Sequence, residues 1–274
     1  AKNSVASRNR YALYTTYSAQ VDITGAQKEQ FKLAEDAFNG ISGKLNTLFT
    51  TDIPNLEKEF ENADVVIRMP AGGGVGAGPF HSQSNEAWFS HTPGLKVVYP
   101  STPHDAKGLL IASFEDPNPI LFFEHKGLYR SLSEEIPDDY YTVEIGKAKV
   151  VREGSVVSII TYGQMVHKAK ELVEEMNIDA EILDLRTLLP IDYDAVETTV
   201  KKTNRVIILH EDTLFGGIGG ELSAHISEHY FEHLDAPVMR AAGLDTPIPF
   251  AKTLEKDFMP LGRLREKLDR MIKY

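Results

Sequence analysis

A single histidine follows a run of glycines in the stretch MPAGGGVGAGPFHSQS, residues 69–84. Glycine adopts backbone conformations that other residues rarely take, so this run can make a tight turn just before His81. Imidazole exchanges protons near neutral pH and can act as an acid, a base or a charge stabiliser. One interpretation is therefore a loop that sets His81 in a cleft. The alternative is a structural histidine, hydrogen-bonded to backbone in a packed loop.

Two other interpretations of the glycine run are disfavoured. Residues 72–77 fit a relaxed G-x-G-x-x-A spacing, but Pro79 interrupts the helix that a dinucleotide site requires, and no ribose-binding acid follows. A Walker loop is excluded because no Gly-Lys-Ser/Thr follows the glycines. A plain linker is disfavoured because the run leads directly into Phe80, Trp88 and Phe89, which we expect to be buried.

Other polar groups lie at places where chemistry could occur. The sequence His-Glu-Asp at 210–212 ends a predicted strand, and strand ends face the binding crevices of α/β sheets; structural or interface use is favoured. His225, His229 and His233 are spaced to share a helix face and could hold a metal, although a surface stripe is the favoured interpretation. The glycines of the FGGIGG turn, 215–220, are interpreted as permitting close helix–sheet packing.

Two α/β series could position these residues. Short β-branched runs at DVVIRMP, LKVVYPS and PILFFEH predict buried strands, and DAKGLLIASFED predicts a helix between two of them. Residues 134–142 are acidic, lack periodicity and are interpreted as part of a linker. From SVVSIITYG onward, strands and helices alternate up to the closing helix LGRLREKLDRMIKY, which is typical of a doubly wound domain.

The N-terminal part has a different pattern. Residues 27–49 carry apolar side chains at helical spacing, with Asp22 and Thr24 as candidate caps. A second helix is predicted over 53–63, after the turn Thr-Thr-Asp, with Pro54 near its start. The sequence therefore predicts a helical hairpin that serves in packing or interaction.

Bulk composition narrows the function classes. The formal net charge of −11 argues against general nucleic-acid binding, because phosphate contacts need a basic surface. The chain shows no eighteen-residue apolar run and no signal-peptide core, so neither a membrane span nor export is expected. The absence of cysteine excludes disulfides and thiolate metal sites and fits a cytoplasmic enzyme.

A long resemblance bears on the histidine loop. The segment VIRMPAGGGVGAGPFHSQSNEAWFSHTPGLKVVYPSTPHDAKGLL resembles the beta subunit of the thiamine-diphosphate-dependent first component of 2-oxo acid dehydrogenase complexes, of the branched-chain or pyruvate type. It continues through EDPNPILFFEHKGLYR, EILDLRTLLPID, RVIILHED, FGGIGGELSAHI and LDAPVMRAAGLDTPIPF. It covers residues 65–274, and the form GAGPFHSQSNEAWF is most similar to chains in which alpha and beta regions are fused.

The resemblance implies an architecture. It consists of a helical segment of unassigned origin (1–64), a remnant of a pyrimidine-binding α/β domain (65–133), a linker (134–148) and a doubly wound transketolase C-terminal-like domain (149–274). The first part of the family's pyrimidine domain, with the glutamate that contacts the cofactor, has no match here. The helix carrying Glu57, Glu59 and Glu61 is no substitute, because these are interpreted as a solvated face. A truncated or chimeric reading frame is favoured over a reduced paralogue or a chain dependent on other subunits.

The resemblance also implies functional residues. His81 would assist acyl transfer from thiamine diphosphate to the lipoyl arm, with Ser82, Gln83 and Ser84 as its supporting shell. A structural potassium ion would take oxygen ligands from the Ser113 carbonyl, Asp116 and Asn118, and from backbone carbonyls of the strand at 65–66. An ordinary Asp-Pro-Asn turn is the alternative for that segment.

Two functions of different classes follow. In the first, the chain is the C-terminal portion of a beta subunit, inactive without the missing regions and an alpha partner, which would bring magnesium and the diphosphate site. The reaction would be oxidative decarboxylation of a 2-oxo acid and acylation of lipoyl groups. In the second, the chain is a non-catalytic module that docks on the lipoyl acyltransferase core or on another beta chain. A transketolase-like relative is a weaker third interpretation, which the HSQS loop disfavours.

Overall fold

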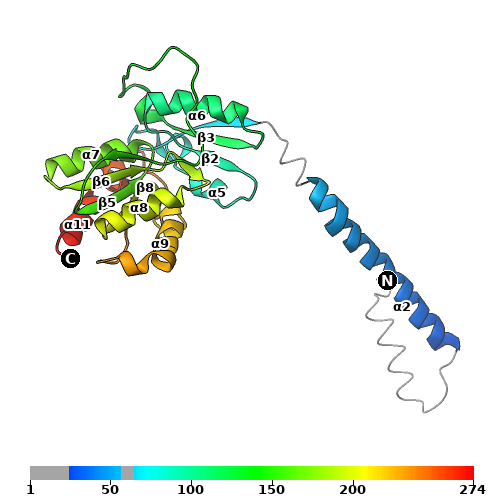
Figure 1. Cartoon of the computed structure of the whole chain (residues 1–274). Coiled ribbons are helices and arrows are strands. Elements are labelled where there is room, and N and C mark those ends of the chain that lie inside the picture. The colour runs from blue at the N-terminus through cyan, green and yellow to red at the C-terminus, as the bar shows by residue number, and fades with distance from the viewer. Residues whose placement is uncertain (1–24, 57–64) are drawn as a thin grey trace. The chain divides into compact units, whose positions relative to one another are not determined.

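The computed structural model describes residues 25–56 and 65–274. The chain divides into two compact units, residues 1–60 and residues 61–274 (Figure 1). Within the described residues, no helix is both long enough and apolar enough to cross a membrane.

The described part of the first unit is one continuous run of helix. It comprises α2 (Gly25–Thr47), the π-helical η1 (Leu48–Asp52) and helical residues 53–56. The predicted helix is confirmed, but the turn of the predicted hairpin is wrong, because the Thr-Thr-Asp segment is itself helical. Thr50 Oγ1 donates to the carbonyl of Asn46 at 2.7 Å, so its hydroxyl finds an acceptor within the helix, four residues back. The candidate caps Asp22 and Thr24 and residues 57–63 lie outside the described residues.

A four-stranded sheet forms the first half of the second unit. Its strands, in the order β1-β3-β2-β7, are β1 (Val66–Ala71), β3 (Ile120–His125), β2 (Lys96–Val98) and β7 (Thr187–Leu189). The first three are parallel, whereas β7 arrives from much later in the chain and pairs antiparallel with β2. Helix α6 (Pro103–Glu115) covers one face of this sheet, packing Leu109 against Val98 and Phe122 (Figure 1).

Strand β1 is more exposed than its apolar sequence predicts. We expected a buried strand, but β1 forms an edge of the described sheet, and Ile67 is 49% exposed. Pro70 lies inside the strand, which an edge tolerates because its missing N–H is not needed by a second neighbour. The β-branched run therefore identified the strand correctly but not its position.

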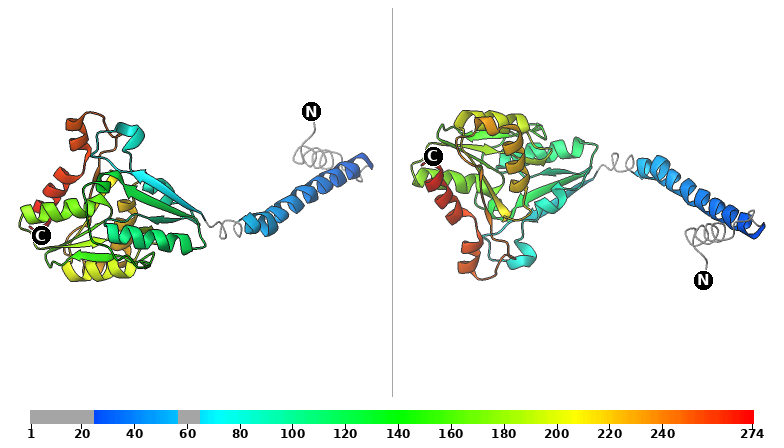
Figure 2. Two further views of the ribbon diagram at one scale, coloured as in Figure 1. Left: turned by 90° about the horizontal axis from the view of Figure 1, so that it is seen from above. Right: turned by 90° about the horizontal axis from the view of Figure 1, so that it is seen from below.

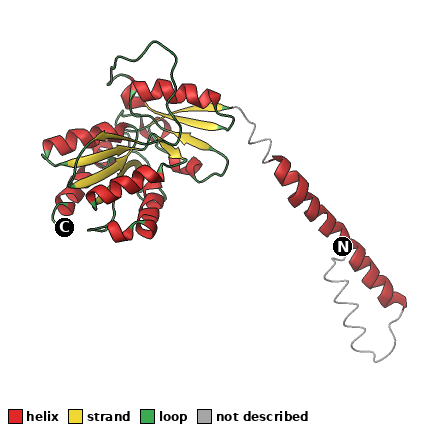
Figure 3. Ribbon diagram, viewed as in Figure 1, coloured by secondary structure: helices red, strands yellow, loops and turns green. Residues whose placement is uncertain are grey.

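A five-stranded sheet forms the second half of this unit (Figure 3). Its strands, in the order β4-β6-β5-β8-β9, are β4 (Lys149–Arg152), β6 (Ala180–Asp184), β5 (Val157–Thr161), β8 (Val206–Thr213) and β9 (Met239–Gly243). Only β4, which the sequence pattern did not predict, runs antiparallel to its neighbour.

Helices cover both faces of this second sheet (Figure 2). α7 (Gln164–Glu175) and α11 (Leu261–Met271) bury their apolar side chains against one face. α8 (Tyr193–Thr203) and α9 (Ile218–His229) cover the other, in a core that also includes Leu121 and Phe123 of the first sheet. The predicted α/β architecture with a doubly wound second part is confirmed.

Short elements complete the unit. They are α4 (Gly78–His81), α5 (Glu86–Ser90), η2 (Lys126–Tyr129), η3 (Phe231–His233) and α10 (Lys252–Phe258). Residues 132–148 contain no helix or strand. This segment is fastened to α6, since Tyr141 donates a hydrogen bond to the His104 carbonyl at 2.9 Å and stacks on the His104 ring.

Candidate functional site

The glycine run forms the loop between β1 and α4. Gly72, Gly74, Gly76 and Gly78 all have positive φ angles, between 64° and 97°, which side chains with a Cβ rarely adopt. Space is limiting at two of them. A Cβ on Gly72 would lie 2.2 Å from the His125 ring, and one on Gly78 would lie 2.2 Å from the Phe250 ring. The alternating left-handed residues turn successive loop amides towards the C-terminal part of the chain.

Two carboxylates of the chain itself accept those amides. Glu255 of α10 accepts from Gly74 N at 2.9 Å and from Gly76 N at 3.1 and 3.0 Å. Glu211 of β8 accepts from Gly73 N. The loop thus holds anions through its backbone, as a phosphate cradle does, but these anions are internal side chains.

His81 ends the short helix that follows the loop and is exposed. Ser82 is buried, and its hydroxyl has no hydrogen-bond partner in the described structure. Gln83 is exposed, whereas Ser84 is buried and donates to Glu211 Oε1 at 3.0 Å. Among the described residues, no hydrogen bond joins the His81 ring to these three predicted supporting side chains. Of the three, only Ser84 contacts Glu211 by a hydrogen bond in the described structure.

The aromatic residues around His81 differ from expectation. Phe80 and Trp88 are 82% and 67% exposed, so the prediction that the loop leads into buried aromatics is wrong for both. Phe89 is half-buried and packs on Phe123 with ring centroids 6.1 Å apart. Phe80 instead faces Phe250 at 6.4 Å. An exposed apolar surface therefore flanks the histidine.

Glu211 is the centre of a buried polar network behind the loop. Its Oε2 lies 2.8 Å from His125 Nε2, and both side chains are almost inaccessible. Burial acts to raise the pKa of Glu211, but the charge and hydrogen bond of His125, with the hydrogen bonds of Gly73 and Ser84, outweigh it and lower that pKa. The carboxylate is therefore ionised and stays a hydrogen-bond acceptor for the loop.

Two further acids, Glu86 and Asp212, lie beside this network, and their pKa values are raised instead of lowered. Burial raises the pKa of Glu86 to about 8, and the nearby charge of Asp212 adds to that rise. Tyr162 donates to Glu86 Oε1 at 2.6 Å, and Glu86 Oε2 has no partner in the described structure. Burial raises the pKa of Asp212 to about 6, although the backbone amides of Thr213 and Ala87 donate to it. The network therefore holds a neutral Glu86 next to an ionised Glu211 at neutral pH.

The strand end at 210–212 is thus part of the site and not only of the domain core. His210 has the structural role that was favoured for it, since burial lowers its pKa to about 4 and keeps the ring neutral. Its ring packs against the glycine turn, where a Cβ on Gly217 or Gly219 would lie 2.6 Å from it. Close packing, predicted for the FGGIGG glycines, is confirmed at these two positions.

The predicted potassium ligands are engaged with one another and with a lysine. Asp116 forms an ion pair with Lys96 and accepts from the backbone and side-chain amides of Asn118 at 3.0 and 2.7 Å. Partial burial acts against ionisation, but the hydrogen bonds from Lys96 and Asn118 lower the pKa of Asp116. The Val65 carbonyl accepts from Ile120 N, and the predicted Ser113 carbonyl belongs to the last turn of α6. An amide turned as a donor and a carboxylate paired with an ammonium do not fit a potassium site, and Lys96 supplies the positive charge.

The histidine stripe of α9 also differs from its prediction. His225 and His229 are neighbours on the helix, with centroids 4.3 Å apart, but His233 belongs to the separate 3-10 turn η3. His225 stacks on Tyr193 at 3.7 Å. In the part of the chain that the structure describes, no group of three or more His, Asp or Glu side chains could hold a metal.

Sequence reasoning missed Glu255, Tyr162 and His125. Glu255 lies in a short helix among other charged residues and is 181 residues from the loop amide it accepts. Nothing local distinguishes it from a solvated glutamate. The buried Tyr162 and His125 follow or end predicted strands, and that position is the only signal that could have pointed to them.

Family models match both halves of the second unit. Residues 54–131 match the model described as transketolase, pyrimidine binding domain, and residues 146–262 match the model described as transketolase, C-terminal domain. The chain therefore carries two domains of the transketolase family. The first match begins at residue 54, ahead of position 65, where the sequence resemblance begins. The pyrimidine-binding domain contributes His81, the glycine loop and Glu86, whereas the C-terminal domain contributes Tyr162, Glu211 and Glu255.

Curated relatives of these two domains are beta subunits. The 2-oxoisovalerate dehydrogenase subunit beta of Bacillus subtilis is 50% identical over 199 residues, which are 71% of this chain and 61% of that protein. The pyruvate dehydrogenase E1 component subunit beta of the same organism is 47% identical over 191 residues, covering 69% and 59%. That of Porphyra purpurea is 45% identical over 223 residues, covering 80% and 66%. The predicted resemblance is confirmed, and the chain spans about three fifths of the length of the two Bacillus subtilis relatives.

A solved structure shares the fold. The structure titled "Split gene transketolase, inactive beta4 tetramer" superposes with a TM-score of 0.61 at 22% identity, covering 76% of this chain and 66% of that one. Thiamine diphosphate is the cofactor of this family of enzymes.

Proposed function

We propose that this chain is the C-terminal portion of a beta subunit of a 2-oxo acid dehydrogenase first component. The supporting observation is an exposed His81 on a glycine loop that buried carboxylates hold in place. Identity of 44–50% to beta subunits of the 2-oxoisovalerate and pyruvate enzymes supports the same proposal. The reaction would be oxidative decarboxylation of a 2-oxo acid followed by acylation of a lipoyl group.

His81 would act in the acyl-transfer half of this reaction. When the lipoyl disulfide opens, one sulfur takes the acyl group and the other leaves as a thiolate, which needs a proton. An exposed imidazole can deliver that proton near neutral pH or stabilise the developing charge. Phe80, 82% exposed beside it, offers an apolar surface for the lipoyl chain.

The described residues do not make a complete site for thiamine diphosphate. The loop amides that could hold a phosphate already bind Glu211 and Glu255. We therefore propose that the cofactor, with magnesium, would be held between this chain and an alpha subunit or alpha region. Beta–beta contacts and the lipoyl acyltransferase core are the other proposed partners.

A reconstituted reaction tests this proposal. This chain is mixed with an alpha subunit of the family, thiamine diphosphate, magnesium, a lipoyl domain and either 2-oxoisovalerate or pyruvate, and acyl-lipoyl formation is measured. We expect His81→Ala to lower that rate about 10²- to 10⁴-fold, the usual range for one acid–base group. The matched control is His91→Ala, another exposed histidine in the same domain, which should leave the rate unchanged.

A specific observation favours a second function. Large apolar side chains of the C-terminal domain are exposed: Phe215 at 85%, Phe231 at 74% and Phe250 at 60%. Exposed apolar side chains mark a protein-binding surface where they lie together in one patch, so a non-catalytic assembly module is the alternative. Binding to an alpha subunit or acyltransferase core with no cofactor binding in any mixture would support the module and contradict the enzyme.

A further inference from the structure

Glu255 of α10 is a buried carboxylate that binds the amides of the glycine loop. It is 4% exposed, and every hydrogen bond to its side chain in the described structure comes from the glycine loop. In that part of the chain it forms no ion pair with a lysine, arginine or histidine. Burying a carboxylate is unfavourable unless hydrogen bonds or charges compensate. Three bonds from two loop amides supply that compensation, so the carboxylate and the loop stabilise each other.

The segment around Glu255 supports the loop by packing as well. A Cβ on Gly73 would lie 2.4 Å from Ile248 Cδ1, and a Cβ on Gly78 would lie 2.2 Å from the Phe250 ring. The segment 248–255 of the C-terminal domain therefore lies directly against the loop on the side of its amides. The loop has no room to move towards it.

Strand β8 holds the other end of the same stretch. Glu211 accepts from Gly73 N and from the Ser84 hydroxyl, and Asp212 accepts from the Ala87 amide. His81 lies between these two attachments and itself remains exposed. The chain from 73 to 87 is thus fixed on both sides of the histidine, by acids that belong to another domain.

We propose that Glu255 is a positioning residue, through which the C-terminal domain sets the place of His81 by clamping the glycine loop, with Glu211 as the second point of the clamp. This inference rests on the proposed function for the role of His81, but the clamp itself is a property of the chain alone. Without Glu255, the amides of Gly74 and Gly76 lose their acceptor. The loop then takes several conformations, and His81 no longer has a single position.

Hydrogen exchange tests the clamp without any activity. In the full chain, amide exchange of residues 72–81 is compared between the parent protein, Glu255→Gln and Glu255→Ala. Hydrogen bonds to a charged group are worth enough to slow opening about ten- to a hundredfold, so exchange of this segment should accelerate by that factor in the alanine variant, and by less in the glutamine variant. Exchange of the core strand 157–161 should not change.

The matched control is Asp257→Asn, which removes one negative charge from an exposed position of the same helix. It should leave loop exchange as in the parent protein. Unchanged exchange of residues 72–81 in both Glu255 variants would overturn the clamp, as would equal acceleration in Asp257→Asn. If the alanine variant does not fold, the isosteric glutamine variant decides.

Measurements of acyl transfer distinguish a failure of the clamp from a failure of the proposed function. In the reconstituted reaction, Glu255→Gln should raise KM for the lipoyl domain or lower the acyl-transfer rate, while binding of the alpha subunit stays as in the parent protein. Faster loop exchange together with unchanged acyl transfer would overturn Glu255 as a positioning residue. If His81→Ala is fully active, the proposed function fails, whereas the exchange result still decides whether the clamp exists.

Discussion

Neighbouring carboxyl groups at the domain junction have opposite ionisation tendencies. Glu211 has a lowered pKa because His125 and three hydrogen bonds outweigh its burial. Glu86 accepts hydrogen bonds from Tyr162 and from its own backbone amide, but burial outweighs them and raises its pKa to about 8. The difference comes from partners and not from depth, since both groups are fully buried. The neutral acid avoids a second negative charge beside Glu211, and this arrangement should appear in the pH dependence of stability.

Because the pKa of Glu86 is raised in the native state, we expect its contribution to stability to fall as the pH rises. The native state binds the Glu86 proton more tightly than the unfolded state, where the pKa is near its ordinary value of 4.5. Stability from this group is therefore complete below about pH 4.5 and is lost as the pH rises towards 8. Glu86→Gln mimics the neutral acid, so it should be more stable than the parent protein at pH 9, by about 2–4 kcal/mol, and not at pH 5.

Thermal melting of both proteins across pH 5–9 measures this difference. The control is Glu174→Gln at an exposed position of α7, which makes the same substitution away from the buried network. The side chains of Asp212, Glu211 and Tyr162 are the same in both proteins, so the difference reports the ionisation of Glu86 together with its effect on Asp212. A constant gap between the curves of Glu86→Gln and the parent would contradict a neutral Glu86 in the native state.

At this scale, sequence reasoning singled out His81 and the strand end at 210–212 but did not connect them, and it missed Glu255. The spacing of glycines and a histidine drew attention to His81 but left a structural histidine open, and the family resemblance supplied its expected role. The acceptors of the loop amides could not be found in the same way. Glu211 and Glu255 are 138 and 181 residues away from the amides they bind, and side chains are brought together over such separations only by packing.

At the scale of the element, two glycines of the loop differ in the reason for which a side chain would be unfavourable. Gly72 and Gly74 both have positive φ, at 97° and 75°. A Cβ on Gly72 meets the His125 ring, whereas one on Gly74 meets nothing within 4 Å. Backbone strain is therefore common to both positions, and steric overlap is present at only one.

Alanine substitutions separate these two effects. Gly74→Ala should lower the free energy of unfolding by about 1–2 kcal/mol, the cost of a left-handed alanine. Gly72→Ala should lose about 1–3 kcal/mol more, since the methyl group displaces His125 from Glu211. Urea denaturation of the two variants measures the difference, and equal losses would show that the His125 ring gives way freely.

Local patterns predicted most elements but not their neighbours. Period and apolar content identified β1, β2, β3 and the alternating series of the C-terminal domain. They did not show that β1 is an edge strand, because the number of neighbours is set by the sheet and not by the strand. They also missed β7, a three-residue strand that leaves its own domain to pair with β2. The hairpin was predicted wrongly because Thr50 bonds within the helix.

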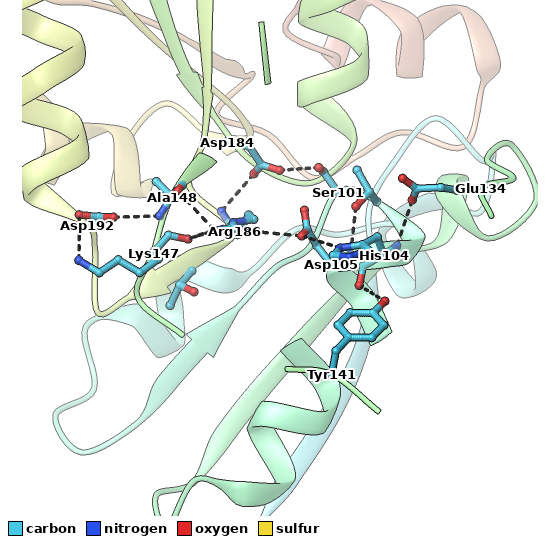
Figure 4. Close-up of polar contacts among 12 residues, drawn as sticks. Ser101, His104, Asp105, Glu134, Tyr141, Lys147, Ala148, Asp184, Arg186 and Asp192 are labelled. Carbon is cyan, nitrogen blue, oxygen red and sulfur yellow. Dashed lines mark hydrogen bonds and ion pairs between the residues drawn. The ribbon is translucent and has the colours of Figure 1, made fainter. Parts of the chain in front are cut away.

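At the scale of the whole molecule, a group of polar contacts joins the two domains and the segment 132–148 between them (Figure 4). Arg186 follows β6 and donates to the Lys147 carbonyl at 3.0 and 2.7 Å and to Asp105 Oδ1 of α6 at 3.2 Å. Asp184 accepts from Arg186 N at 3.1 Å and binds Ser101. One buried guanidinium therefore contacts all three parts of the unit.

Loss of this guanidinium should weaken the junction more than either domain. Asp105 is 1% exposed, and its Oδ2 already has no hydrogen-bond partner in the described structure. Arg186→Ala would remove the guanidinium from that carboxylate and leave it with the His104 ring, 3.5 Å from Oδ1, a cost of about 3–5 kcal/mol. We expect calorimetry to show a lower melting temperature and separate transitions for the two domains, because the contact that couples them is lost first.

A double-mutant cycle tests whether the coupling runs through Asp105. Asp105→Asn in the Arg186→Ala background removes the buried charge, so the double variant should be more stable than Arg186→Ala alone. Two sites that do not interact would instead add within about 0.5 kcal/mol. Because the linker carbonyls of Lys147 and Ala148 still lose their donor, recovery should be partial. Full additivity with a single unshifted transition would mean that the apolar core shared by the two sheets, and not Arg186, holds the domains together.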